Sequence, residues 1–285
     1  MAPLRALERC VVFGSEQHLQ GMLCEPAGAP PGSDVPVVLM WNVGPIHRVG
    51  PYRMNVELAR QLADIGVPSL RFDLTGLGDS GTARSEHLTR DRAVADVREA
   101  MDYLAQRCGT TRFVLVGHCS SADNAHRAAV ADKRVQGAVL IDGYSYVTWR
   151  CCMRRYGLFL LNPDRIRNLI VRTLHWVAGW FDRGGAAAAG EETAFAWQLP
   201  PHHEAAADLQ ALVDRGVELM YVFAGQYHRR YNYAHQFYDM YPGVAMRDRV
   251  VSHFMQDCDH TFSGVAGRRR LIGLIREWAA DRFMG

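Results

Sequence analysis

Residues 112–132 read RFVLVGHCSSADNAHRAAVAD, and this stretch decides the fold. Its apolar beginning, residues 112–118, predicts a strand buried on both faces. Residues 120–132 predict a helix. Between them, Gly117-His118-Cys119-Ser120-Ser121 has the G-x-nucleophile-x-G spacing of a tight strand-to-helix turn, the nucleophile elbow. The spacing makes Cys119 the candidate nucleophile.

An elbow strains the backbone of the nucleophile and needs small residues two places to either side. Gly117 and Ser121 meet this need, with Ser121 in place of the usual glycine. Ser120 and Ser121 are poorer nucleophile candidates, because His118 and Cys119 stand two places before them. A helix that begins beneath the sulfur favours a thiolate. The alternative for Cys119, a buried core thiol, is disfavoured by the elbow spacing.

Strands and helices alternate on both sides of the elbow. This alternation predicts an α/β fold with a mostly parallel central sheet and helices on both faces. Further strands are predicted over 35–41, 67–74, 135–143, 217–225 and 248–255, further helices over 54–65, 89–107, 203–214 and 267–283, and a hairpin over 9–24.

The alternation stops after the strand 135–143. Residues 145–204 contain an aromatic-rich helical stretch, 167–181, and a Gly/Ala segment, 184–190, typical of a surface connection. We therefore expect one α/β core, made of residues 1–144 and 205–285, with a helical lid inserted between them.

Composition excludes several classes of protein. The 285 residues carry 32 basic and 30 acidic side chains, a net charge of +2, so we expect neither nucleic-acid nor anionic-membrane binding. Seven cysteines without a CxxC pair predict neither a zinc site nor a disulfide framework. We expect no signal peptide and no membrane span, because the first residues and every apolar run are unsuited to either. Reduced thiols and these absences predict a cytoplasmic protein.

The chain resembles the α/β-hydrolase superfamily over most of its length. RFDLTGLGDSG (71–81), similar to the motif FDxRGxGxS, the cysteine elbow and DHTFSG (259–264) carry the resemblance. Within the superfamily, NxGxxHRVGPxR at 42–53 is similar to bacterial hydrolases encoded with exosortase or exopolysaccharide systems. The cysteine also resembles that of dienelactone hydrolase and of acyl-shuttling transferases. The resemblance implies an α/β-hydrolase fold and acyl-transfer chemistry.

In this fold the catalytic base follows the last strand. His260 is the histidine on that loop, and the order of nucleophile before histidine fits. We expect His118, next to the nucleophile, to be turned away by strand alternation.

The acid departs from the usual pattern. After the strand 217–225, where G-x-x-D is expected, residues 225–228 read GQYH and lack a carboxylate. Asp142, at the end of the preceding strand, is the candidate acid, although a turn residue before Gly143 is an equal alternative. Asn232 could instead orient the imidazole, and a Cys–His dyad could work without an acid.

The oxyanion hole is expected to pair the Ser120 backbone N–H with one from the loop after residues 35–41, either Val43 or Gly44. The glycines of 76–81 match GxGxxG, but no helix opens there, so we expect no dinucleotide.

Three further residues are weaker candidates for contacting substrate. His47 and Arg48 could bind an anionic group, or make structural ion pairs with Asp73 or Asp79. Trp176 could line an acyl pocket or pack within the lid.

These residues predict an acyl-transfer enzyme that hydrolyses an ester or thioester through a thioester acyl-enzyme on Cys119. It needs neither a metal nor a cofactor, and its partner is a small acyl substrate. One alternative is an acyltransferase that takes its acyl group from a carrier protein or CoA. Another is a non-catalytic scaffold that binds a small ligand.

Overall fold

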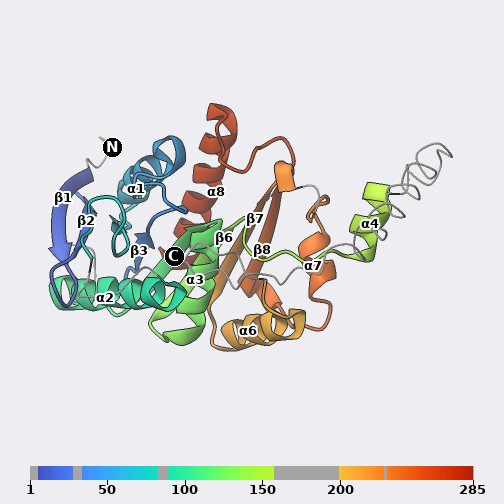
Figure 1. Cartoon of the computed structure of the whole chain (residues 1–285), viewed down its shortest axis with the longest axis horizontal. Coiled ribbons are helices and arrows are strands. Elements are labelled where there is room, and N and C mark those ends of the chain that lie inside the picture. The colour runs from blue at the N-terminus through green and yellow to red at the C-terminus, as the bar shows by residue number, and fades with distance from the viewer. Residues whose placement is uncertain (1–5, 28–33, 83–88, 157–198, 228–229, 285) are drawn as a thin grey trace, which may run out of the picture.

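A mostly parallel sheet runs through the centre of the computed structural model, which describes residues 6–27, 34–82, 89–156, 199–227 and 230–284 (Figure 1). In the described residues it has eight strands in the order β1-β2-β4-β3-β5-β6-β7-β8. They are β1 (Ala6–Phe13), β2 (Leu19–Pro26), β3 (Val37–Met40), β4 (Ser69–Phe72), β5 (Phe113–His118), β6 (Val135–Ile141), β7 (Glu218–Ala224) and β8 (Val250–Met255).

Two orientations of strand occur in the sheet. The hairpin of β1 and β2 is antiparallel, and β2 also pairs antiparallel with β4. From β4 to β8 every pairing is parallel. The central strands β3, β4 and β5 are buried at every residue. The sequences of β3 and β5 are nearly continuous apolar runs, as burial on both faces favours, whereas β4 also buries Ser69 and Arg71.

Helices cover both faces of the sheet (Figure 1). Alternate strand residues divide into two apolar clusters, one packed against α1 and α8 and the other against α2, α3 and α6. The longer helices are α1 (Met54–Asp64), α2 (Arg90–Cys108), α3 (Ser120–Ala131), α6 (His202–Asp214) and α8 (Val265–Phe283), and the shorter ones are α4 (Trp149–Tyr156) and α7 (Gln236–Met240).

The strand order places a topological switch point at the carboxyl ends of β3 and β5. Strands β3 and β5 are neighbours, but the chain leaves β3 toward α1 on one face and leaves β5 toward α3 on the other. Loops that diverge at the carboxyl ends of neighbouring parallel strands leave room for a ligand between them. Cys119 directly follows β5 and therefore lies at this switch point.

The predicted fold class and the strands and helices of the core are confirmed, with boundaries that differ by at most three residues. Within the expected lid, the structure describes α4 and the first turn of α6. The aromatic stretch 167–181, with Trp176, and the segment 184–190 lie outside the described residues. The division into core and lid stays a prediction.

Candidate active site

The backbone at Cys119 has the conformation that an elbow demands. Its φ of 57° and ψ of −120° lie in a backbone region that residues other than glycine rarely adopt. The Cys119 N–H donates to the Ile141 carbonyl at 2.9 Å, which ties the turn to the end of β6. The Cys119 carbonyl accepts from the Ala122 N–H at 3.0 Å and opens helix α3. The strain is thus held by hydrogen bonds on both sides of the thiol.

Small residues flank the elbow for a steric reason. A Cβ at Gly117 would lie 2.3 Å from the Ser121 carbonyl oxygen, so no other residue fits there without a shift of the backbone. Ser121 takes the usual glycine position and adds two hydrogen bonds. Its Oγ accepts from the His118 N–H at 2.7 Å and donates to the His118 carbonyl at 2.8 Å. The Ser121 side chain therefore adds two hydrogen bonds to the turn that a glycine could not make.

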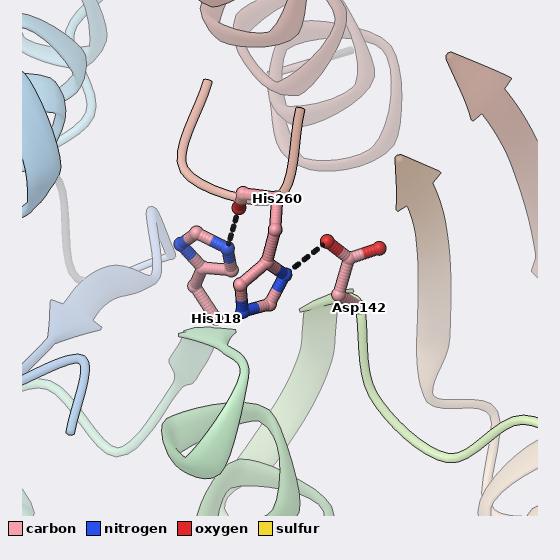
Figure 2. A group of neighbouring side chains, drawn as sticks. All are labelled: His118, Asp142 and His260. Atoms are coloured by element: carbon pink, nitrogen blue, oxygen red, sulfur yellow. Dashed lines mark hydrogen bonds and ion pairs between the residues drawn. The ribbon is translucent and has the colours of Figure 1, made fainter. Parts of the chain in front are cut away.

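His260 lies between an acid and the elbow thiol. Its Nδ1 is 2.7 Å from Asp142 Oδ2 (Figure 2), and the other side of the ring hydrogen bonds to the Cys119 side chain. Asp142 follows β6 and His260 follows β8, so three loops at the carboxyl edge of the sheet supply the three side chains. The structure thus brings together the three candidate catalytic residues predicted from the sequence.

The protonation of His260 follows from these contacts. Burial opposes the charged ring, but hydrogen bonds and charge interactions with Asp142 and Cys119 outweigh it and raise the pKa of His260 to about 10. The ring is therefore an imidazolium at neutral pH.

Asp142 is rigidly held for its contact with His260. Its carboxylate is fully buried, and its φ of 50° is that of a strained turn. Its N–H donates to the Val222 carbonyl at 2.8 Å, and Oδ1 accepts from the Ala224 N–H at 2.7 Å. One carboxylate oxygen therefore anchors the loop to β7, which leaves the other for His260.

The alternative acid and the loop without a carboxylate have other roles. The Asn232 side-chain amide donates to the Cys151 carbonyl at 3.0 Å, so this group holds α4 and does not orient the imidazole. Gln226 stands in the loop after β7, where the acid was expected, and its Oε1 accepts from the His260 N–H at 3.0 Å. The loop after β7 thus contacts the backbone of His260 through the Gln226 side chain.

The proposed oxyanion donors are not equivalent. The Gly44 N–H donates to Ser120 Oγ at 3.0 Å, so a substrate oxygen would have to compete with that hydroxyl for it. Ser120 opens α3, and first-turn amides of a helix have no acceptor within the helix. The N–H groups of Ser120 and Val43 are therefore the better pair of donors, and they remain a prediction.

Arg48 is engaged in ion pairs within the loop after β3. Its buried guanidinium contacts the carboxylates of Asp73 and Asp79, the structural alternative considered from the sequence. Its backbone N–H donates to Asp73 Oδ1 at 2.7 Å. His47 Nε2 lies 3.3 Å from both carboxylates and remains partly exposed. The cluster fixes the loop, and a contact of His47 or Arg48 with a substrate stays a prediction.

Sequence reasoning missed one contact of His118. We expected strand alternation to turn this side chain away from Cys119. The structure places its ring 5.0 Å from that of His260, and its Nε2 lies 2.7 Å from the His260 carbonyl oxygen (Figure 2). No local pattern signals such a contact, because it joins residues 142 positions apart.

Groups that could hold a metal do occur among the described residues. His118, Asp142 and His260 bring one ligand atom each within 4.8 Å of one another. Asp142 Oδ2 and His118 Nε2 are already engaged in the hydrogen bonds above. The arrangement therefore suits proton transfer better than metal binding.

In the part of the chain that the structure describes, no helix has the length and apolar character to cross a membrane.

Comparison with known proteins identifies the fold. No family model and no curated protein sequence matches the chain. Among solved structures, Est1E from Butyrivibrio proteoclasticus is similar, with a TM-score of 0.59 and 13% identity over 97% of this chain and 99% of that one. The Pyrococcus furiosus esterase Pf2001 has a TM-score of 0.58 and 14% identity, over 98% and 92% of the two chains.

A third similar structure is a meta-cleavage product hydrolase, CumD, from Pseudomonas fluorescens IP01. Its TM-score is 0.56 at 14% identity, over 96% of this chain and 97% of that one. Together with the sheet order and the elbow, these similarities show that the chain has the α/β-hydrolase fold. At such identities the likeness extends to the fold alone.

Proposed function

We propose that this protein is an acyl-transfer enzyme that hydrolyses an ester or thioester through a thioester acyl-enzyme on Cys119. One observation carries the proposal. His260 is hydrogen bonded to the buried carboxylate of Asp142 on one side and to the thiol of Cys119 on the other. A nucleophile, a base and a group that orients the base are the parts that acyl transfer requires.

In the first half of the reaction, the Cys119 thiolate attacks the substrate carbonyl carbon. A carbon–sulfur bond forms, and the carbonyl π electrons move to the oxygen, where the N–H groups of Ser120 and Val43 would hold the charge. When the tetrahedral intermediate collapses, the bond to the leaving group breaks. The leaving alkoxide or thiolate takes the proton from His260 Nε2 and departs as an alcohol or thiol.

In the second half, neutral His260 accepts a proton from water as the water oxygen attacks the thioester carbon. Collapse of this intermediate breaks the carbon–sulfur bond and releases a carboxylic acid. The Cys119 thiolate and the His260 imidazolium are restored. Asp142 accepts the hydrogen bond from Nδ1 throughout and orients the ring, as the acid of a triad does.

The alternatives differ in what the site must do. A ligand-binding scaffold needs no ordered Asp–His–Cys arrangement, and its main support, the missing carboxylate after β7, is weakened by the contact between Asp142 and His260. An acyltransferase would use the same first half-reaction. Its acyl-enzyme would be discharged by an amine, alcohol or thiol, and a thioester reacts well with amines and thiols.

The test is to trap the acyl group. The protein is mixed with a short-chain acyl-CoA or a p-nitrophenyl ester, quenched in acid, and weighed as the intact protein, with peptide mapping to locate the adduct. We expect one acyl group on Cys119, and none in Cys119→Ala. Cys10→Ala is the matched control, because Cys10 is an exposed free thiol on β1, outside the site.

The discharge of the adduct separates the two reactions. An adduct lost in water indicates a hydrolase, and one that persists until an amine or a carrier thiol is added indicates a transferase. The absence of any adduct in the wild-type protein, together with unchanged turnover in Cys119→Ala, would contradict the proposal.

A further inference from the structure

The residue before the nucleophile is bonded to the backbone of the base. His118 is the last residue of β5, and its Nε2 lies 2.7 Å from the His260 carbonyl oxygen (Figure 2). Because a carbonyl oxygen can only accept, Nε2 carries the hydrogen and donates it. The two rings lie edge to face, with centroids 5.0 Å apart and planes at 63°. The aromatic ring of Phe262 packs on the same histidine, with centroids 5.9 Å apart.

His118 stays neutral over the working range of pH. Burial disfavours its charged form and, despite the nearby carboxylates of Asp142 and Asp259, lowers its pKa to about 4, with a further contribution from the positive charge of His260. Its tautomer is therefore constant: the hydrogen is on Nε2, and Nδ1 has only a lone pair.

The unpartnered Nδ1 lowers the stability of the folded chain. His118 is 2% exposed, and its Nδ1 finds no hydrogen-bond partner among the described residues. A buried polar atom without a partner destabilises the folded chain, and an apolar side chain of similar size would avoid this. Packing alone therefore gives no reason for a histidine at this position, whereas its donated hydrogen bond does.

The bond matters because of where it acts. His260 stands on a loop between β8 and α8, and its ring is 27% exposed. Three hydrogen bonds fix His260. Its N–H donates to Gln226 Oε1 at 3.0 Å, its Nδ1 bonds to Asp142, and its carbonyl accepts from His118. Small displacements of a catalytic group are costly, since a shift of about 1 Å can reduce the rate about 100-fold.

We propose that His118 is a positioning residue that fixes the backbone of His260, so that the imidazolium stays in contact with the Cys119 sulfur. The inference rests on the proposed function, because it concerns the same Cys119–His260 pair. His118 does not touch the reacting atoms in this role, and it acts through His260 alone. Its donor, not its ring volume, is the property that the site needs.

Three variants separate the donor from the volume. His118→Leu removes the donor and keeps a buried apolar side chain. His118→Gln keeps an N–H that reaches the position of Nε2, and His118→Asn keeps a polar group that is too short. The rate of Cys119 alkylation by iodoacetamide is measured between pH 5 and pH 9 by peptide mapping, together with kcat/KM and the thermal midpoint.

We expect His118→Leu and His118→Asn to lose about 10- to 100-fold in the alkylation rate at neutral pH. Their profiles should shift to higher pH, toward that of a thiol without an imidazolium neighbour. His118→Gln should stay within about threefold of the wild type. The thermal midpoint of His118→Leu should stay close to the wild-type value, because the loss of the unmet Nδ1 offsets the loss of the donor to the His260 carbonyl.

A wild-type alkylation profile and kcat/KM in His118→Leu would overturn the inference, and so would a His118→Gln variant as impaired as His118→Leu. If the leucine variant does not fold, the glutamine and asparagine variants decide the question by the same comparison. The failure of the proposed function is distinguishable, because it appears in the wild-type protein as a Cys119 that neither alkylates readily nor carries an acyl group.

Discussion

At the scale of the residue, the proposed chemistry depends on the proton of one histidine. His260 is protonated at neutral pH because Asp142 and Cys119 together outweigh the effect of burial. The proton needed by the leaving group is therefore present before substrate binds. A serine at position 119 would not form a charged pair with an imidazolium before substrate binds, because a hydroxyl is far harder to ionise than a thiol.

Asp142→Asn tests this view of the site. The variant keeps an oxygen near Nδ1 but loses the negative charge, so the pKa of His260 falls. We expect kcat/KM to decrease about 100-fold or more. The alkaline limb of its pH profile should move below the wild-type limb near pH 10. Steady-state rates between pH 6 and pH 11 measure both effects.

The control for this variant is Asp91→Asn, at a carboxylate that is 88% exposed and pairs with Arg127. We expect it to keep wild-type rates and the wild-type limb. A value of kcat/KM in Asp142→Asn within threefold of this control would show that Asp142 does not assist His260.

At the scale of the element, the loop after β3 is fixed by one buried carboxylate. Asp73 accepts from the Asn42 side chain at 2.8 Å, from the Arg48 N–H at 2.7 Å and from the Arg48 guanidinium. This loop carries Val43, whose N–H is one of the two proposed oxyanion donors. Its shape therefore depends on an ion pair that is fully closed to solvent on the aspartate side.

Asp73→Asn should destabilise the protein by about 3 kcal/mol, because Arg48 remains buried with a weakened partner. Asp79→Asn is the matched control. Asp79 bonds to the same arginine, but it is 55% exposed, so its loss should cost about 0–1 kcal/mol. Urea unfolding gives both values, and equal losses in the two variants would refute the distinction between the buried and the exposed partner.

Elements with strong local signals were predictable from the sequence. Strand β5 is an apolar run, and α3 begins directly after the elbow, so both were placed within about one residue. The loop after β7 was harder to interpret. The absence of a carboxylate at 225–228 gave no sign that Gln226 would hold the His260 backbone. Such a bond depends on how two loops meet, which local periodicity does not encode.

At the scale of the whole molecule, two histidines give stability opposite dependences on pH. The pKa of His260 rises to about 10 on folding, from about 6.5 in an unfolded chain. The folded state therefore binds more protons in this interval, and the free energy of unfolding falls as the pH rises through it. His118 has its pKa lowered to about 4, so stability also falls as the pH drops from about 6.5.

Urea unfolding from pH 4 to pH 10 should show both declines. His260→Gln should lose part of the alkaline decline, and His118→Leu part of the acid one. Burial raises the pKa of Cys24 to about 11, so some alkaline decline persists without His260. An alkaline slope in His260→Gln as steep as in the wild type would contradict the protonation assigned to His260.

The sequence by itself determined the strands and helices of the core and two of the three candidate catalytic side chains. The elbow around Cys119 and the position of His260 after the last strand are properties of short stretches, because steric demands within a turn act between near neighbours. Only the tertiary structure places Asp142, and not Asn232, in contact with His260. Asp142 and His260 are 118 positions apart, and their contact arises where the carboxyl ends of β6 and β8 reach one edge of the sheet. The contact of His118 with His260 has the same origin, since packing brings distant loops together and no local pattern records which of them meet.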